Sequence, residues 1–344
     1  MIDYPTRIAL AQTPTPLQAL RRLQQRRGGP LIWLKRDDMT GGPLTGNKVR
    51  KLEFLLARAQ QHGCEAVITC GGIQSNHCRA TALAAAGLGL ECHLVLRGLP
   101  DPNCEPQGNE FLDKLAGASI QYVEPREYFA RLQQLFAEQV RRYKKAGKKA
   151  MVIPTGGSNG VGVWGYVRAA EEILQDCKAQ NIDPAAVLCA TGSGGTQAGL
   201  TLGMHLFATG MPVYGINVCD DEQYFLDKVA QDIAEWQQLY PEQSRELDAQ
   251  AISVNVIDGY VGRGYALADE TVFNTIGELA ALEGIVLDPV YTGKAFNGLL
   301  REIDAGRFAG AEHLVFVHTG GIFGLFPFAA NFFPAGSGSA LAPP

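Results

Sequence analysis

Long apolar runs are absent from this sequence of 344 residues, in which no stretch reaches eighteen apolar residues. A helix needs about twenty such residues to cross the hydrocarbon core of a bilayer, so we expect no membrane span and no membrane partner. Residues 1–5 also lack the charged-then-apolar pattern that begins a secretory signal. We therefore expect a cytoplasmic protein.

Basic charge, paired cysteines and clustered histidines are also scarce. The net charge is −5, which disfavours a nucleic-acid partner because such binding depends on a basic surface. The eight cysteines form no CxxC pair and several lie in apolar runs, so we expect buried free thiols. The six histidines show no metal-ligand spacing, and we predict no metal site.

Glycine is abundant instead, with 40 residues, and it clusters where short apolar runs end. The apolar runs are typical of buried strands and cover residues 66–70, 150–154, 186–190 and 314–318. Glycine-rich turns follow at 71–72, 156–157, 192–195 and 320–321. Helix-like segments come after the first three. Strand, glycine turn and helix in repetition predict an open parallel α/β sheet, whose ligands bind beyond the carboxyl ends of the strands.

The turn at residues 192–195 is the first candidate anion site. It brings backbone N–H groups and hydroxyls to the start of an expected helix, where an anion is favoured. A P-loop needs a lysine where this chain has Thr196, and a dinucleotide fingerprint needs a third glycine where Gln197 stands. The turn best fits a phosphate cup for a mononucleotide-like cofactor. A purely structural tight turn is the alternative.

A second candidate anion site follows Gly71-Gly72, where Ser75, Asn76 and His77 precede an alanine-rich helix. Ser75 is well placed as an N-cap, and capping alone is the simpler interpretation. Asn76 and His77 add polar groups that a cap does not need. This helix start is therefore suited to a carboxylate.

Three cations, Lys48, Arg50 and Lys51, stand at the start of a third expected helix. This position is unusual because a helix N-terminus repels positive charge. A bound anion would resolve the conflict, and a lysine there can have a lowered pKa; a solvated basic turn is the alternative. Two anion cups and one such lysine together predict pyridoxal phosphate. Its phosphate would take the glycine turn, Lys48 would take its aldehyde, and the substrate carboxylate would take the second helix start.

The sequence resembles the D-cysteine desulfhydrase and 1-aminocyclopropane-1-carboxylate (ACC) deaminase family, within the tryptophan-synthase-β-like group of pyridoxal-phosphate enzymes. The motifs run in order through residues 14–17, 33–38, 46–48, 71–77, 154–159, 192–199 and 287–294. The resemblance implies fold type II, an α/β fold of two open, mostly parallel twisted sheets flanked by helices. It implies a large domain from residues 1–50 and 163–344, a small domain from 51–162, and a homodimer.

The resemblance also implies a role for each site residue. Lys48 would carry the cofactor as a Schiff base and act as a catalytic base. Ser75, Asn76 and His77 would contact the substrate, with Asn76 also bonding the phenolic oxygen of the cofactor. Tyr265 and Tyr291 match the two active-site tyrosines. The residues that would hold the phosphate are Lys51, Gly192, Ser193, Gly194, Gly195 and Thr196.

Two positions separate the branches of the family. ACC deaminases have Glu where this chain has Thr292, near the pyridine nitrogen, and Leu where it has Thr319. Both threonines match the D-cysteine desulfhydrase pattern. A neutral hydroxyl cannot hold a protonated pyridine as a carboxylate does, so the ring is a weaker electron sink, adequate for β-elimination. We therefore predict a lyase that converts D-cysteine to pyruvate, sulfide and ammonia.

Other positions depart from the family pattern, namely Thr45, Trp164 and the run at residues 322–324 that contains Phe323. We expect these bulky groups to reshape the substrate pocket. The alternatives within the fold are an L-cysteate sulfo-lyase, an ACC deaminase and an amino-acid racemase. A non-catalytic binding protein for a phosphate ligand is a further alternative. An NAD-dependent oxidoreductase is disfavoured because the third glycine is missing.

Overall fold

The computed structural model describes residues 2–207, 209–245, 247 and 252–332. Its strands are β1 (Leu17–Ala19), β2 (Leu31–Lys35), β3 (Ala66–Gly72), β4 (Glu91–Arg97), β5 (Ser119–Val123), β6 (Ala150–Val152), β7 (Val187–Thr191), β8 (Val213–Asn217), β9 (Asn255–Ile257) and β10 (His313–Val317). Its α-helices are α1 (Arg21–Arg27), α2 (Asn47–Gln61), α3 (Asn76–Gly87), α4 (Gly108–Leu115), α5 (Pro125–Lys145), α6 (Trp164–Gln180), α7 (Gly195–Leu206), α8 (Glu222–Leu239), α9 (Glu270–Glu283), α10 (Thr292–Asp304) and α11 (Ala329–Phe332). Short 3-10 helices are η1 (Asp37–Met39), η2 (Thr155–Gly157), η4 (Ile322–Gly324) and η5 (Phe326–Phe328).

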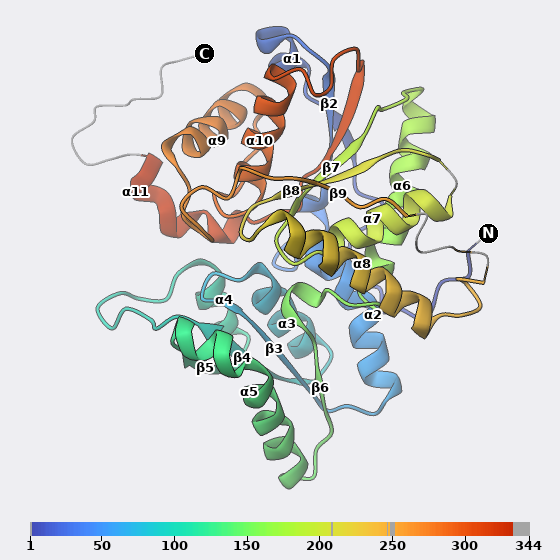
Figure 1. Cartoon of the computed structure of the whole chain (residues 1–344). Coiled ribbons are helices and arrows are strands. Elements are labelled where there is room, and N and C mark those ends of the chain that lie inside the picture. The colour runs from blue at the N-terminus through green and yellow to red at the C-terminus, as the bar shows by residue number, and fades with distance from the viewer. Residues whose placement is uncertain (1, 208, 246, 248–251, 333–344) are drawn as a thin grey trace.

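The larger sheet has six strands in the order β1-β2-β10-β7-β8-β9, and only the β1–β2 pair is antiparallel. It unites strands from both ends of the chain, so blue and orange-red elements lie together in the upper half of Figure 1. Helices cover both of its faces. Alternate side chains of β10 show this, because Leu314 and Phe316 belong to one apolar cluster while Val315 and Val317 belong to another.

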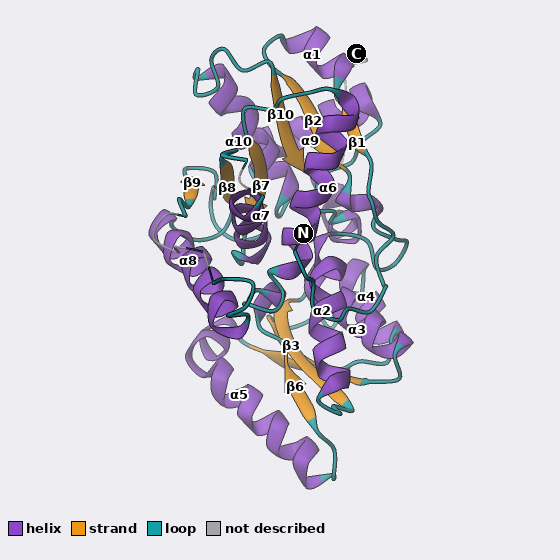
Figure 2. Cartoon of the chain, turned by 90° about the vertical axis from the view of Figure 1, so that its right-hand side faces the viewer, coloured by secondary structure: helices purple, strands orange, loops and turns teal. Residues whose placement is uncertain are grey.

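The smaller sheet has four parallel strands in the order β5-β4-β3-β6. Helix α5 covers one face, where Leu135 and Phe136 pack against Ile68 of β3. Helices α2 and α3 cover the other face. The apolar cluster on that second face also takes in residues of α6, α7 and α8, so it connects the two sheets. Figure 2 shows the larger sheet above the smaller one.

The prediction of an α/β fold with two mostly parallel sheets is confirmed. All four predicted strands are present; three of the glycine turns follow a strand at its carboxyl end, whereas Gly71 and Gly72 are the last two residues of β3. The domain boundaries at residues 50/51 and 162/163 remain a proposal, and α2 runs without a break across the first of them. Among the described residues, no helix combines the length and apolarity that crossing a bilayer requires.

Candidate functional site

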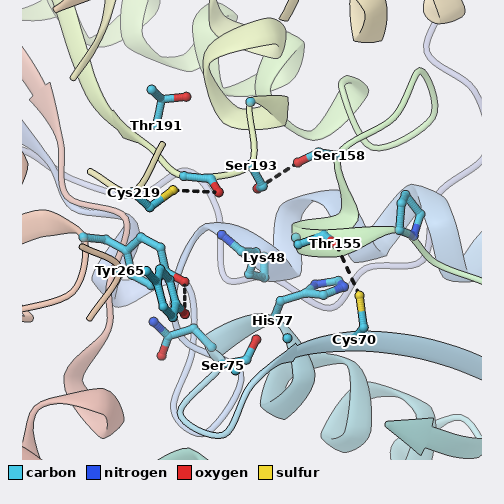
Figure 3. Close-up of a pocket in the computed structure, with 18 of the residues that line it drawn as sticks. Lys48, Cys70, Ser75, His77, Thr155, Ser158, Thr191, Ser193, Cys219 and Tyr265 are labelled. Atoms are coloured by element: carbon cyan, nitrogen blue, oxygen red, sulfur yellow. Dashed lines mark hydrogen bonds between the residues drawn. The ribbon is translucent and has the colours of Figure 1, made fainter. Parts of the chain in front are cut away.

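A cavity of about 440 Å³ lies between the two sheets, where the carboxyl ends of β3, β4 and β7 meet. Eleven of the predicted site residues line it: Lys48, Ser75, Asn76, His77, Gly192, Ser193, Gly194, Thr196, Tyr265, Tyr291 and Thr319. In Figure 3, Lys48 stands between Ser193 and Ser158 on one side and Ser75 and His77 on the other. The structure therefore brings both predicted anion cups and the predicted lysine to one place.

Lys48 is the second residue of α2, and the turn before it determines its position. Gly46 has a φ of 102°, and a Cβ there would lie 2.9 Å from the carbonyl oxygen of Thr319, so only glycine fits without strain. The Lys48 Nζ donates to Asn47 Oδ1 at 3.0 Å and lies 5.9 Å from the centre of the Tyr291 ring. Burial lowers its pKa to about 8, although the Asp288 carboxylate opposes this shift. With this pKa about a tenth of the amine is neutral at pH 7, far more than for an ordinary lysine, and the neutral amine is the form that acts as a base.

Arg50 does not face the cavity, which corrects the expectation that one pocket anion balances all three cations. Its guanidinium donates to both oxygens of Asp37 at 2.8 Å and to both oxygens of Glu172 at 2.9 and 3.0 Å. Tyr166 also donates to Asp37, at 2.5 Å. Burial alone would raise the pKa of Asp37, but the Arg50 guanidinium outweighs it and holds that pKa below its usual range. This buried cluster ties α2 to η1 and α6.

The glycine turn between β7 and α7 forms a cup. The N–H of Gly195 donates to Ser158 Oγ at 3.1 Å, and Ser158 Oγ donates to Ser193 Oγ at 2.9 Å. A Cβ on Gly195 would lie 2.7 Å from Ser158 Oγ, so glycine is needed for this close approach. Gly195 and Lys51 do not themselves line the cavity. Lys51 lies behind the cup, where its Nζ donates to Gly156 O at 3.2 Å and to Ser158 Oγ at 3.3 Å.

The start of α3 forms the second cup. Ser75 is its N-cap, as predicted, and accepts from the N–H of Cys78 at 3.2 Å. Asn109 of α4 donates to Asn76 Oδ1 at 3.0 Å and fixes that amide. The Nε2 of His77 lies 2.8 Å from Thr69 Oγ1, while its buried Nδ1 has no partner among the described residues. Burial, with the charges of Lys48 and Lys51, holds the pKa of His77 well below its ordinary value, so the ring is neutral.

Two tyrosines, Tyr265 and Tyr291, line another part of the cavity, and Figure 3 shows Tyr265 below Cys219. The hydroxyls of Tyr265 and Tyr291 lie 2.7 Å apart. A Cβ on Gly192 would lie 2.9 Å from the Tyr291 ring, so this glycine gives the ring its space. Burial raises the pKa of both phenols, and the Arg97 guanidinium lowers that of Tyr265 in part. Both groups therefore stay protonated at neutral pH, and Tyr265 is the better placed to release a proton.

The two threonines expected to separate the branches of the family, Thr292 and Thr319, lie in different places. Thr319 lines the cavity. Thr292 is buried outside it, at the start of α10, where its hydroxyl donates to Asp288 Oδ1 at 2.7 Å. The Asp288 carboxylate also accepts the N–H groups of residues 290, 291 and 292. Thr292 thus shapes the helix start behind the cavity, and its expected contact with the cofactor remains a prediction.

The bulky residues that depart from the family pattern do not reshape the cavity, so that expectation was wrong. Trp164 is completely buried among Tyr4, Trp236 and Tyr240. The Phe323 ring packs on the Arg79 guanidinium at 5.0 Å. Thr45 is buried and bonded to the carbonyl oxygen of Asp38. None of the three lines the cavity.

Sequence reasoning missed several residues that line the cavity, chiefly Asn47, Arg97, Ser158 and Lys228. A signal existed for Ser158, because it directly follows Gly156-Gly157, one of the glycine turns at a strand end. Arg97 ends a strand that has no glycine cluster at the turn, and Lys228 lies within a charged helix. Neither carried a local signal.

The family profile described as "Pyridoxal-phosphate dependent enzyme" matches residues 8–320 of this chain. The chain belongs to the pyridoxal-phosphate dependent enzymes. A Thermotoga maritima protein provisionally named as an ACC deaminase is 42% identical over 93% of this chain and 97% of its own. The Arabidopsis thaliana mitochondrial bifunctional D-cysteine desulfhydrase/ACC deaminase is 40% identical over 92% of this chain and 79% of its own. A crystal structure titled as an ACC deaminase homologue has a TM-score of 0.85 and 36% identity, over 95% of each chain.

The cavity of this pyridoxal-phosphate dependent enzyme fits its cofactor. The glycine cup offers the hydroxyls of Ser193 and Thr196 and the N-terminal end of α7 to a phosphate. The buried hydroxyl of Thr191 has no partner among the described residues, as expected at a place where a ligand belongs. Lys48 faces the same space with a lowered pKa, ready to react with an aldehyde. These observations agree with the predicted cofactor, pyridoxal phosphate.

Proposed function

We propose that this enzyme is a lyase that catalyses β-elimination from D-cysteine and releases pyruvate, sulfide and ammonia. The observation that supports this choice is the neutral character of the cavity near Thr319. Among the described residues that line the cavity, the one acidic side chain is that of Asp220, which is exposed and lies on the loop after β8. A ring nitrogen on this wall would meet the Thr319 hydroxyl, and position 292, where ACC deaminases have a glutamate, is also a threonine in this chain. This arrangement suits a reaction in which the leaving group takes the electrons.

Lys48 is the proposed general base. Pyridoxal phosphate, when bound, supplies an aldehyde for the substrate amine and a ring that withdraws electrons from the α-carbon. The Lys48 amine, with its pKa lowered to about 8, then takes the α-proton at Nζ. Asn47 holds Nζ through the bond to its Oδ1. The neighbouring Asn47 Nδ2 donates to Thr196 Oγ1 at 2.9 Å, which links the base to the phosphate cup.

The start of α3 is proposed to hold the substrate carboxylate. Ser75 and the N–H groups of the first turn offer donors at the positive end of this twelve-residue helix. The neutral His77 adds no charge there. The fixed carboxylate would direct the α-hydrogen toward Lys48, and this orientation is what such contacts contribute to the rate.

The tyrosine pair is proposed to meet the leaving sulfur. The protonated Tyr265 hydroxyl can give its proton to the departing thiolate while the Tyr291 hydroxyl, 2.7 Å away, shares the charge left behind. Aminoacrylate is then released and hydrolyses to pyruvate and ammonia. The proposal extends to a cytoplasmic homodimer, as the family resemblance implies, and light scattering of the purified enzyme measures that assembly.

A substrate panel tests the proposed function. The purified enzyme, loaded with pyridoxal phosphate, is offered D-cysteine, L-cysteine, β-chloro-D-alanine, L-cysteate and ACC. We expect pyruvate and sulfide in equal amounts from D-cysteine. Release of 2-oxobutyrate from ACC without sulfide from D-cysteine would overturn the proposal in favour of an ACC deaminase, the activity in the names of two relatives. Sulfite from L-cysteate alone would favour the sulfo-lyase.

A further inference from the structure

One cation on the cavity wall, Arg97, has no role in the steps above. It is the last residue of β4 and lies beside Gly72 in the parallel register of the small sheet. Its side chain has no hydrogen-bond or ion-pair partner among the described residues. Lys228, another cavity cation, is paired with Asp232 and also donates to Ser158 O at 3.3 Å. Arg97 is thus a cation whose donors are still available to a ligand.

Aromatic rings hold the Arg97 guanidinium in place. It lies 4.7 Å from the centre of the Tyr265 ring, 5.0 Å from that of Phe129 and 5.6 Å from that of Tyr128. A Cβ on Gly72 would lie 3.3 Å from the Tyr265 ring, so the glycine lets this ring pack close to the strand ends. Rings compensate part of the charge but accept none of the five N–H donors of the guanidinium.

The position of Arg97 relative to the proposed base identifies the part of the substrate that it would meet. Tyr291 lies 5.9 Å from Lys48 Nζ, Tyr265 bonds Tyr291, and Arg97 stacks on Tyr265. The same tyrosines are proposed to contact the leaving group. A guanidinium that stacks on Tyr265 lies on the side of the cavity where the β-substituent is proposed to leave, and the phosphate cup is built from other elements.

We propose that Arg97 determines specificity by binding an acidic β-substituent of the substrate amino acid, such as a sulfonate. This inference rests on the proposed function and widens its substrate class to β-substituted amino acids that carry a negative charge there. With a sulfonate, Lys48 takes the α-proton, the Cβ–S bond breaks, and its electron pair leaves with sulfur as sulfite. The guanidinium can donate two N–H groups to two oxygens of such a group and stabilises the departing charge.

A binding experiment tests Arg97 separately from turnover. The cofactor absorbance of the loaded enzyme is titrated with aspartate and with asparagine, which have nearly the same shape and differ in charge, in both enantiomers. The wild type should bind the acidic ligand at least about 10-fold more tightly. Arg97→Gln should abolish this preference, and Arg97→Lys should keep part of it. Lys228→Gln, which removes a charge elsewhere on the cavity wall, should leave the ratio unchanged.

Kinetics provide the second measurement. Arg97→Gln should lower kcat/KM for sulfite release from cysteate by about 10–100-fold, while chloride release from β-chloroalanine stays within about threefold. Equal binding of aspartate and asparagine by the wild type would overturn the assignment. An equal loss of kcat/KM on cysteate and on β-chloroalanine in the Arg97→Gln variant would overturn it as well. If D-cysteine is not turned over, the proposed function fails, but the aspartate and asparagine ratio still decides the role of Arg97.

Discussion

At the scale of single residues, neighbouring cations of one helix turn have different roles. Lys48 faces the cavity and has its pKa lowered to about 8, whereas Arg50 is neutralised in a buried ion cluster. Lys51 supports the phosphate cup from behind. All three could be located from the sequence, but their separate roles could not, because the partners of Arg50 lie 13 and 122 residues away in the chain.

Removing the Lys48 amine should abolish both cofactor attachment and turnover. We expect Lys48→Ala to lose at least about 100-fold in kcat, since a positioned general base contributes about 10²–10⁴-fold. The absorbance of bound pyridoxal phosphate and the release of pyruvate are the measurements. Lys144→Ala, on the exposed side of α5, is the matched control. A coloured and active Lys48→Ala protein would refute the assigned role.

The pKa of Lys48 predicts a pH dependence. Only the neutral amine attacks an aldehyde, so the rate at which the cofactor-free protein binds pyridoxal phosphate should rise with pH and level off above about 8. Below that value the rate should fall about tenfold per pH unit. Stopped-flow absorbance from pH 6 to 9.5 measures it. A midpoint above 10, the range of an ordinary lysine, would show that burial does not lower this pKa.

At the scale of elements, glycine turns and buried charges determine where helices begin. The turn before α7 could be predicted as a cup because its glycines follow a strand directly. The contribution of Ser158 could not, since its contact with Gly195 joins segments 37 residues apart. The contacts made by Trp164 and Phe323 were mispredicted for the same reason. Their bulk is visible in the sequence, but the direction of each side chain depends on packing partners elsewhere.

The ion cluster under α2 should contribute strongly to stability. Arg50→Met leaves Asp37 and Glu172 buried without their shared partner, and we expect a loss of about 3–5 kcal/mol in the free energy of unfolding. Arg168→Met is the matched control, because it removes a longer, more exposed pair with the same Glu172 and should cost about 0–1 kcal/mol. Urea unfolding measures both. Equal losses in the two variants would contradict the argument.

The first glycine of η2, Gly156, should be needed for the phosphate cup. A Cβ on Gly156 would lie 2.2 Å from Ser193 Oγ, so Gly156→Ala should displace that hydroxyl and weaken pyridoxal-phosphate binding by roughly tenfold. Gly147 has a similar φ of 77° but open space around its Cα. Gly147→Ala therefore reports the backbone strain alone. Cofactor titration should separate the two variants, and equal affinities would rule out the steric explanation.

At the scale of the whole molecule, the site belongs to neither sheet alone. The phosphate cup comes from the larger sheet and the carboxylate cup from the smaller one, and one apolar cluster runs between them. Parallel strands made the fold predictable, since four of them have a glycine cluster at or just after the carboxyl end. The way in which the two sheets face each other depends on this shared cluster, which has no local pattern in the sequence.

Pyridoxal phosphate should therefore stabilise both sheets together. At 100 times its dissociation constant, a ligand that binds only the folded protein adds about 2.7 kcal/mol to the free energy of unfolding. Hydrogen exchange followed by mass spectrometry should show slower exchange in β3 and β4 as well as in β7 and β8. Protection confined to one sheet would mean that the other does not take part in binding.

Helix α2 has fifteen residues, with Lys48 near one end and its far end over the smaller sheet. Its length is about 22 Å, so a tilt of roughly 5° about the far end would carry the amine about 2 Å, beyond the reach of a hydrogen bond. The helix acts as a lever arm. Substitutions near Gln61 that weaken the packing of this end of α2 should therefore slow the reaction without altering any group that the substrate touches.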